Sequence, residues 1–172
     1  LFQYLPLGKD ADLSLMPTPQ QRDRVRAVTK HWQQTRPAFV GDFWNDGACV
    51  GACLSANRYC YVTAEGKVQP CTFVHYYTHD LNECSLLDVF RSPFFRAIRG
   101  QQPYSKNLLL PCKIIDRPDV LREVVAEHGA MPSYPGADNI TNDDGVRAFL
   151  DGYAERWEKI AEEVWEGPDY KS

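Results

Sequence analysis

The stretch CLSANRYCYVTAEGKVQPC, residues 53–71, has a cysteine at each end and a single glycine, Gly66, five residues before the second end. Its β-branched and aromatic residues predict two strands, over 58–63 and within 67–75. Gly66 lies between them and suits the left-handed backbone of a tight turn. We therefore predict a β-hairpin that folds the chain back and brings the two ends of the stretch together.

The register of this hairpin decides which thiols are neighbours. If the loop consists of the two residues 65–66, Cys60 falls opposite Cys71. Paired residues of a hairpin share a face, so these two thiols would then lie side by side. A shift of one residue would separate them.

Six cysteines in one chain need an explanation, and their positions are 49, 53, 60, 71, 84 and 112. Disulfides are one alternative, but chains that rely on them are usually shorter and have a smaller core. Cys60 and Cys84 have apolar neighbours, which is typical of buried, inert thiols. Cys53, Cys71 and Cys112 lie at the ends of the hairpin and in a distant loop, where soft thiolates suit an iron–sulfur cluster or zinc.

Composition limits the possible partners. The 172 residues are 44% hydrophobic and carry 19 Lys and Arg against 23 Asp and Glu, a net charge of −4. This balance is typical of one globular domain with or without appendages. The absence of a Lys/Arg run argues against a nucleic-acid partner, and no apolar stretch approaches the roughly 20 residues of a membrane span. We expect a cytoplasmic protein and, because the chain begins at Leu1 without Met, a piece of a longer one.

The first part of the chain predicts half of an α/β repeat. Residues 1–7 alternate enough to predict a short strand. Thr18-Pro19-Gln20-Gln21 is a helix-start signal that predicts a helix over 19–34. Its apolar residues recur at helical spacing: Val25, Val28 and Trp32.

Further helices are predicted after the hairpin. Ser85 and Ser92 are candidate N-caps for two short helices, and Pro118 opens a third. Residues 131–139 are rich in Pro and Gly and predict a connector. An apolar stripe over about 142–166 predicts a long C-terminal amphipathic helix. Together with the hairpin, these elements predict an α+β fold.

Short motifs surround the cysteines in a definite order. They are Phe43-Trp44-Asn45-Asp46-Gly47, Val50-Gly51-Ala52-Cys53, Gly66-Lys67-Val68-Gln69-Pro70-Cys71, Ser92-Pro93-Phe94-Phe95 and Leu110-Pro111-Cys112. In this order they resemble the C-terminal part of a radical SAM protein with a SPASM or twitch domain, over about residues 1–130. The resemblance implies a β-hairpin-containing iron–sulfur domain with several helices, preceded by the last βα unit of a partial (β/α) barrel.

The resemblance also implies a division of the chain. Residues 1–36 would be the remnant of the radical SAM barrel, its last strand and helix. Residues 37–130 would be the auxiliary cluster domain of SPASM or twitch type. Residues 131–172 would be the connector and the C-terminal amphipathic helix.

A ligand set follows from the same resemblance. Cys53 and Cys71, with Gly66 between them, match the family's CX9–15GX4C element, and Cys112 matches its late ligand. The full seven-cysteine set is absent, which favours a single [4Fe-4S] cluster of the twitch type. For the fourth ligand we favour Cys49, which matches an extra thiol found in the family; Cys60 and an open iron position are the alternatives.

The family's SAM-binding cluster is a separate matter. Its motif is CxxxCxxC, and Cys49 and Cys53 have the spacing of its first two cysteines. The third would fall at position 56, which is Ala56. The chain therefore lacks the SAM site, and we expect it to be part of an enzyme without being catalytic by itself.

The implied function is an auxiliary iron–sulfur cluster-binding domain of a radical SAM enzyme, for electron transfer or substrate anchoring. SAM would bind only in the full-length protein, on the missing N-terminal barrel, and the substrate would be a small molecule or a peptide. The alternative is a structural zinc-binding interaction domain with a closed tetrahedral thiolate site. Zinc, or no metal, is also an expected content of the isolated fragment.

Overall fold

A computed structural model describes residues 1–170. A single turn of 3-10 helix spans Leu13–Leu15. The α-helices are α1 (Pro19–Thr35), α2 (Gly47–Val50), α3 (Leu86–Arg91), α4 (Pro93–Gly100), α5 (Pro118–Glu127), α6 (Asn139–Asn142) and α7 (Asp144–Trp165). The strands are β1 (Tyr61–Val62), β2 (Val68–Gln69), β3 (Tyr76–Tyr77) and β4 (Met131–Pro132).

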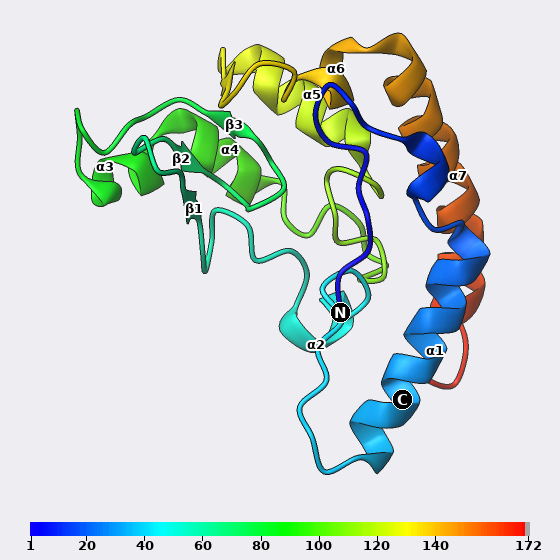
Figure 1. Cartoon of the computed structure of the whole chain (residues 1–172). Coiled ribbons are helices and arrows are strands. Elements are labelled where there is room, and N and C mark those ends of the chain that lie inside the picture. The colour runs from blue at the N-terminus through cyan, green and yellow to red at the C-terminus, as the bar shows by residue number, and fades with distance from the viewer. Residues whose placement is uncertain (171–172) are drawn as a thin grey trace.

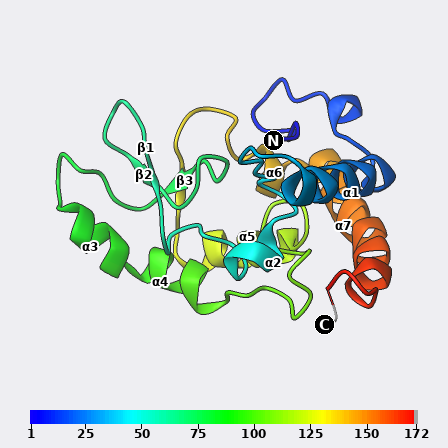
Figure 2. The ribbon, with the colours of Figure 1, turned by 90° about the horizontal axis from the view of Figure 1, so that it is seen from below.

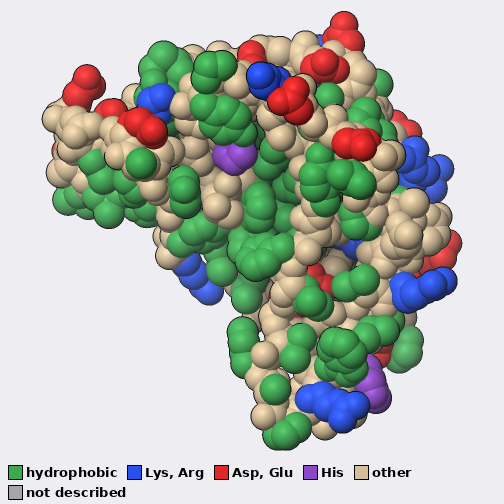
Figure 3. All heavy atoms as spheres, in the orientation of Figure 1, with side chains coloured by type: hydrophobic (Ala, Val, Ile, Leu, Met, Phe, Trp, Pro, Cys, Tyr) green, Lys and Arg blue, Asp and Glu red, His purple; other side chains and the backbone are tan. Residues whose placement is uncertain are grey.

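The elements gather at two ends of the molecule. Helices α1 and α7 lie side by side at one end, and the hairpin β1–β2 lies with α3 and α4 at the other (Figures 1 and 2). The long loops between them occupy the middle, next to α2 and the N-terminus (Figure 1). In Figure 3, hydrophobic side chains gather along the hollowed side between the two ends.

The strands form two small antiparallel sheets, which confirms the α+β class. In the first, β1 pairs with β2. In the second, β3 pairs with β4, which lies in the stretch predicted as a connector. Short polar–apolar segments such as Met131–Pro132 carry too little periodicity to predict a strand, and β4 forms because β3 offers it an edge.

The predicted helix starts are confirmed. The Thr18 hydroxyl accepts the N–H of Gln21, whose side chain accepts the N–H of Thr18, so both halves of a capping box are formed. Ser85 makes the same box with Asp88, and Ser92 caps α4. Each cap satisfies backbone donors that the first turn of a helix leaves free.

The predicted strand over residues 1–7 is wrong. The N–H of Leu7 donates to the carbonyl of Leu5 in a tight turn, and Pro6 between them has no N–H. The backbone bonds to other segments are isolated: the Leu1 carbonyl accepts the N–H of Phe43, and the Pro6 carbonyl accepts the side-chain amide of Asn139. With no continuous partner edge, an alternating sequence does not form a strand.

Helix α1 buries the opposite face from the one its apolar residues suggest. Val25, Val28 and Trp32 are exposed, whereas Arg22 is almost completely buried. The guanidinium of Arg22 stacks on Trp157 of α7, 4.1 Å from the ring centroid. Hydrogen-bond partners for Arg22, described below, draw this polar face inward and leave the apolar stripe on the surface.

The predicted C-terminal helix is α7, and it completes the core at this end. Its buried residues recur at helical spacing and are Val146, Leu150, Tyr153, Trp157 and Ala161. The indole N–H of Trp157 donates to the carbonyl of Leu109 at 3.0 Å, which ties α7 to the loop that precedes Cys112. Within residues 1–170, no helix has the length and apolar character needed to cross a membrane.

Candidate metal centre

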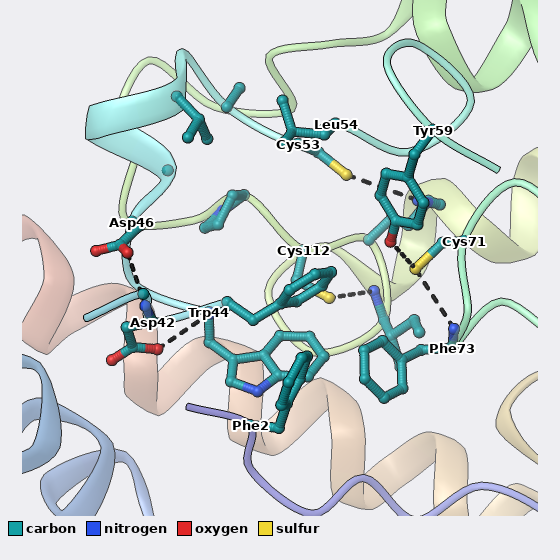
Figure 4. Close-up of a pocket in the computed structure, with 18 of the residues that line it drawn as sticks. Phe2, Asp42, Trp44, Asp46, Cys53, Leu54, Tyr59, Cys71, Phe73 and Cys112 are labelled. Atoms are coloured by element: carbon teal, nitrogen blue, oxygen red, sulfur yellow. Dashed lines mark hydrogen bonds between the residues drawn. The ribbon is translucent and has the colours of Figure 1, made fainter. Parts of the chain in front are cut away.

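A cavity of about 530 Å³ lies between the N-terminal segment, the loop around α2 and the hairpin. Cys53, Cys71 and Cys112 all line it. Figure 4 shows their sulfur atoms facing the same space from three separate chain segments. The structure thus brings together the three cysteines that the sequence motifs singled out.

The hairpin accounts for the proximity of Cys53 and Cys71. Gly66 has a φ of +96°, a backbone region that favours glycine, and it closes the turn as predicted. At the open end of the hairpin, the N–H of Ala56 donates to the carbonyl of Pro70 at 2.8 Å. This bond fixes the residues just after Cys53 against the residue just before Cys71.

The predicted facing of Cys60 and Cys71 is wrong. The N–H of Thr63 donates to the carbonyl of Lys67, so the loop has the three residues 64–66 rather than two. A three-residue loop with glycine in the left-handed position is a common hairpin connection. It shifts the register by one residue, and Cys60 does not line the cavity.

The loop that carries Cys112 is held by a buried ion pair. The carboxylate of Asp116 accepts the backbone N–H of Cys112 at 2.9 Å and pairs with Arg22 of α1. The loop also packs tightly on α2, because a Cβ added to Gly47 would lie 2.2 Å from the carbonyl oxygen of Leu108. Cys112 is therefore positioned by both helices.

Two side chains donate hydrogen bonds to the thiols. The Tyr59 hydroxyl lies 3.0 Å from the Cys71 sulfur (Figure 4). The Lys113 ammonium lies 3.8 Å from the Cys53 sulfur. Donors near sulfur stabilise the thiolate form, which is the form that binds metal. These contacts prepare the cavity for negatively charged sulfur.

Backbone N–H groups also donate hydrogen bonds to two of the cysteine sulfurs. The N–H of Phe73 donates to the Cys71 sulfur, and the N–H of Ile114 donates to the Cys112 sulfur, both at 3.4 Å. In each case the donor lies two residues after the cysteine. The chain around both thiols is thus folded so that its amides point at sulfur.

Burial acts in the opposite direction on the thiol of Cys112. Burial raises its pKa above the ordinary value, and the neighbouring charges of Asp116 and Cys53 raise it further. Without a bound cation, this thiol therefore keeps its proton. A metal that binds there must displace that proton, which couples metal binding to pH.

Aromatic rings form one wall of the cavity. The rings of Trp44 and Phe73 lie 5.0 Å apart between centroids, and Phe43 packs on Phe73 at 5.6 Å and on Phe2 at 5.2 Å. The rings give the cavity an apolar wall, on which Phe2 and Phe43 are exposed at the outer side.

Residues 53–114 match the family model of the SPASM domain, whose description is iron-sulfur cluster-binding domain. The match begins at Cys53 and includes Cys71 and Cys112. The chain carries a SPASM domain. The comparisons of this chain with the curated proteins and with the solved structures found no match. The matched residues lie inside the predicted limits 37–130 of the cluster domain, and those limits stay a prediction.

Cys49, predicted as the fourth ligand, lies apart from the other three. It belongs to α2, outside the residues matched to the SPASM family, and its side chain is exposed. It lines a second, more polar cavity with Lys30 and Gln33 of α1. The structure therefore brings three of the four predicted ligands of the SPASM domain together.

The remaining cysteines have the surroundings expected of inert thiols. Cys60 and Cys84 are half-buried and pack against the core. The Cys84 thiol donates to the carbonyl of Asp80. All six cysteines lie within the described residues and are free thiols in the structure.

The three thiols of the SPASM domain surround a space and do not converge on a point. Within residues 1–170, no three His, Cys, Asp or Glu side chains are close enough to hold one metal ion. A cluster presents a different iron atom to each thiolate.

Two residues of this site were not predicted from the sequence: Tyr59 and Lys113. Lys113 directly follows Cys112, and a lysine next to a ligand cysteine is the signal that would have drawn attention to it. Tyr59 has no such signal. It reaches Cys71 only because the loop over 54–59 folds back on the hairpin.

Proposed function

We propose that Cys53, Cys71 and Cys112 bind a [4Fe-4S] cluster, and that this cluster is an auxiliary cluster of a radical SAM enzyme. The observation that carries the proposal is the meeting of three thiols at one cavity, inside the residues that match the SPASM family. Soft donors, space and hydrogen-bond donors directed at sulfur all suit such a cluster.

When bound, the cluster would supply electron transfer or an iron atom that anchors a substrate. The three thiolates would leave one of four irons without a cysteine ligand, which is the condition that anchoring needs. The rings of Trp44 and Phe73 would exclude water from the cluster, and Tyr59 would hold its hydrogen bond on Cys71. The substrate that we propose is a small molecule or a peptide.

A radical SAM barrel is the partner that we propose, since this chain lacks the third cysteine of the SAM-cluster motif. The apolar stripe of α1 supports this: Val25, Val28 and Trp32 are exposed and would be covered by such a partner. Free thiols and a thiolate-bound cluster suit a reducing compartment, so we place the protein in the cytoplasm.

The first test is iron and sulfide analysis of the full chain, purified and reconstituted without oxygen. We expect about four irons for each chain and a broad absorption band in the visible range. Zinc without visible absorption, in place of iron, would support the structural zinc domain instead. Among the contacts of residues 1–170, none favours that second function.

Single substitutions test the ligand set. We expect Cys71→Ser to lose most of the iron and Cys84→Ser, a matched control outside the cavity, to keep it. We expect Cys49→Ser to keep its iron as well. Loss of iron in the Cys49 variant would return Cys49 to the ligand set, and unchanged iron in the Cys71 variant would remove Cys71 from it.

A further inference from the structure

Lys113 is a cation in the interior of the molecule. Its residue is 2% exposed, and its ammonium donates to the Ser55 hydroxyl at 2.6 Å. Its other neighbours are the sulfur of Cys53 at 3.8 Å and the ring of Tyr104, 5.9 Å away at its centroid. None of these groups carries a permanent negative charge.

The ammonium also lacks a carboxylate partner. Among the described residues, no Asp or Glu oxygen lies within 4.0 Å of it. A buried charge is strongly unfavourable unless it is paired. The groups near Lys113 that can become negative are Cys53, Cys71, Cys112 and Tyr104. The counter-charge of Lys113 therefore has to come mainly from the thiolates and whatever they bind.

We propose that Lys113 is the internal counter-cation of the bound cluster and sets its reduction potential. This inference rests on the proposed function, because it assumes a cluster on Cys53, Cys71 and Cys112. Reduction adds one electron, and so one negative charge, to a group that is already anionic. A fixed positive charge next to Cys53 stabilises the reduced form more than the oxidised form and so raises the potential.

Lys113 acts through charge and is a positioning residue, not a cluster ligand. The ammonium lies 3.8 Å from the Cys53 sulfur, so its charge also attracts the anionic, thiolate-bound cluster and favours its uptake. Two properties should therefore depend on the sign of the side chain at position 113, the reduction potential and the iron content. Neither should depend on lysines elsewhere on the chain.

The test is a redox titration of the reconstituted full chain with a low-potential chemical reductant, followed by electron paramagnetic resonance. The variants are Lys113→Met and Lys113→Gln, which remove the charge, and Lys113→Arg, which keeps it. Lys106→Met is the matched control, because Lys106 is an exposed lysine in the same part of the chain. Circular dichroism checks that each variant is folded.

We expect the two neutral variants to have a more negative potential than the wild type, and the Arg and Lys106 variants to resemble the wild type. If the neutral variants do not take up the cluster, retention of iron by Lys113→Arg supports the proposal equally. An unchanged potential in Lys113→Met overturns the inference, as does an equal loss of iron in all three Lys113 variants. A wild-type chain that takes up no iron overturns the proposed function as well, which distinguishes the two failures.

Discussion

Arg22 and Lys113 are both buried cations, but the protein surrounds them in opposite ways. Arg22 pairs with Asp116 and also donates to the side chain of Asn45 and to backbone carbonyls. Lys113 has a hydroxyl, a sulfur and a ring. Arg22 has a carboxylate partner within the fold, so this pair contributes to the stability of the fold. Lys113 has none, so we infer that its counter-charge comes from the cluster bound in the cavity.

The two cations are linked through one short segment of the chain, residues 112–116. Asp116, which neutralises Arg22, accepts the N–H of Cys112, and Lys113 is the next residue. The structural pair thus fixes the short segment that presents both a thiol and an ammonium to the cavity. Substitutions in the two regions should separate the contributions to stability from those to cluster properties.

The largest effect is expected for Arg22→Met, which leaves the carboxylate of Asp116 buried without its partner. Breaking a buried pair from one side typically costs about 3–5 kcal/mol. Urea unfolding measures this loss, and Arg147→Met is the control because Arg147 pairs with Asp144 at the surface. A loss below 1 kcal/mol for Arg22→Met would show that the pair is not structural.

The double variant Arg22→Met/Asp116→Leu should recover part of this stability. Replacing both partners of a buried pair by apolar side chains is often close to neutral. Here the N–H of Cys112 loses its acceptor, and an unsatisfied buried donor costs about 1–3 kcal/mol. We therefore expect the double variant to unfold between the wild type and Arg22→Met; a result below Arg22→Met would contradict the pairing.

Gly47→Ala tests the packing of the Cys112 loop on α2. The added Cβ would lie 2.2 Å from the carbonyl oxygen of Leu108 and 3.0 Å from Pro111, so the loop must move. Overpacking of this kind typically costs about 1–3 kcal/mol. We expect lower stability and reduced iron binding, while Gly100→Ala, with open space around its Cβ, changes neither.

Much of this architecture could be predicted because the signals are local. The capping box at Thr18 and the turn glycine at Gly66 each act within a few residues, and the structure has both. The predicted register was wrong because the hairpin loop has three residues and not two, and the sequence around Gly66 does not distinguish the two lengths. The prediction of a strand over residues 1–7 was wrong, because a strand needs a partner edge from a distant part of the chain and none is continuous there.

The residues of the site also differ in whether a local sequence signal marks them. The meeting of Cys53, Cys71 and Cys112 at one cavity could be predicted, because an ordered set of motifs marks them, and their role as ligands stays a prediction. Cys49, on α2, lines the second cavity instead. Tyr59 could not be predicted, because its contact depends on the fold of a loop with no periodic pattern.

The smallest effect, a shift in the cluster's reduction potential, is expected for Tyr59→Phe. This variant removes a neutral hydrogen-bond donor, whereas Lys113→Met removes a charge. The Tyr59 hydroxyl donates to the Cys71 sulfur at 3.0 Å. Burial raises the pKa of this hydroxyl and the charge of Cys71 raises it further, so it remains a neutral donor at the pH of the measurement. Its loss should lower the cluster's reduction potential in the same direction as Lys113→Met, by the equivalent of about 1 kcal/mol for one neutral hydrogen bond.

The same redox titration measures this variant, with Tyr61→Phe as the control because Tyr61 is exposed on β1. A fixed charge acts on all three thiolates at once, whereas a hydroxyl acts on the one sulfur that it contacts. The shift in Tyr59→Phe should therefore be smaller than that in Lys113→Met. A larger shift would mean that local hydrogen bonding at Cys71, and not the buried ammonium, dominates the electrostatics of the cavity.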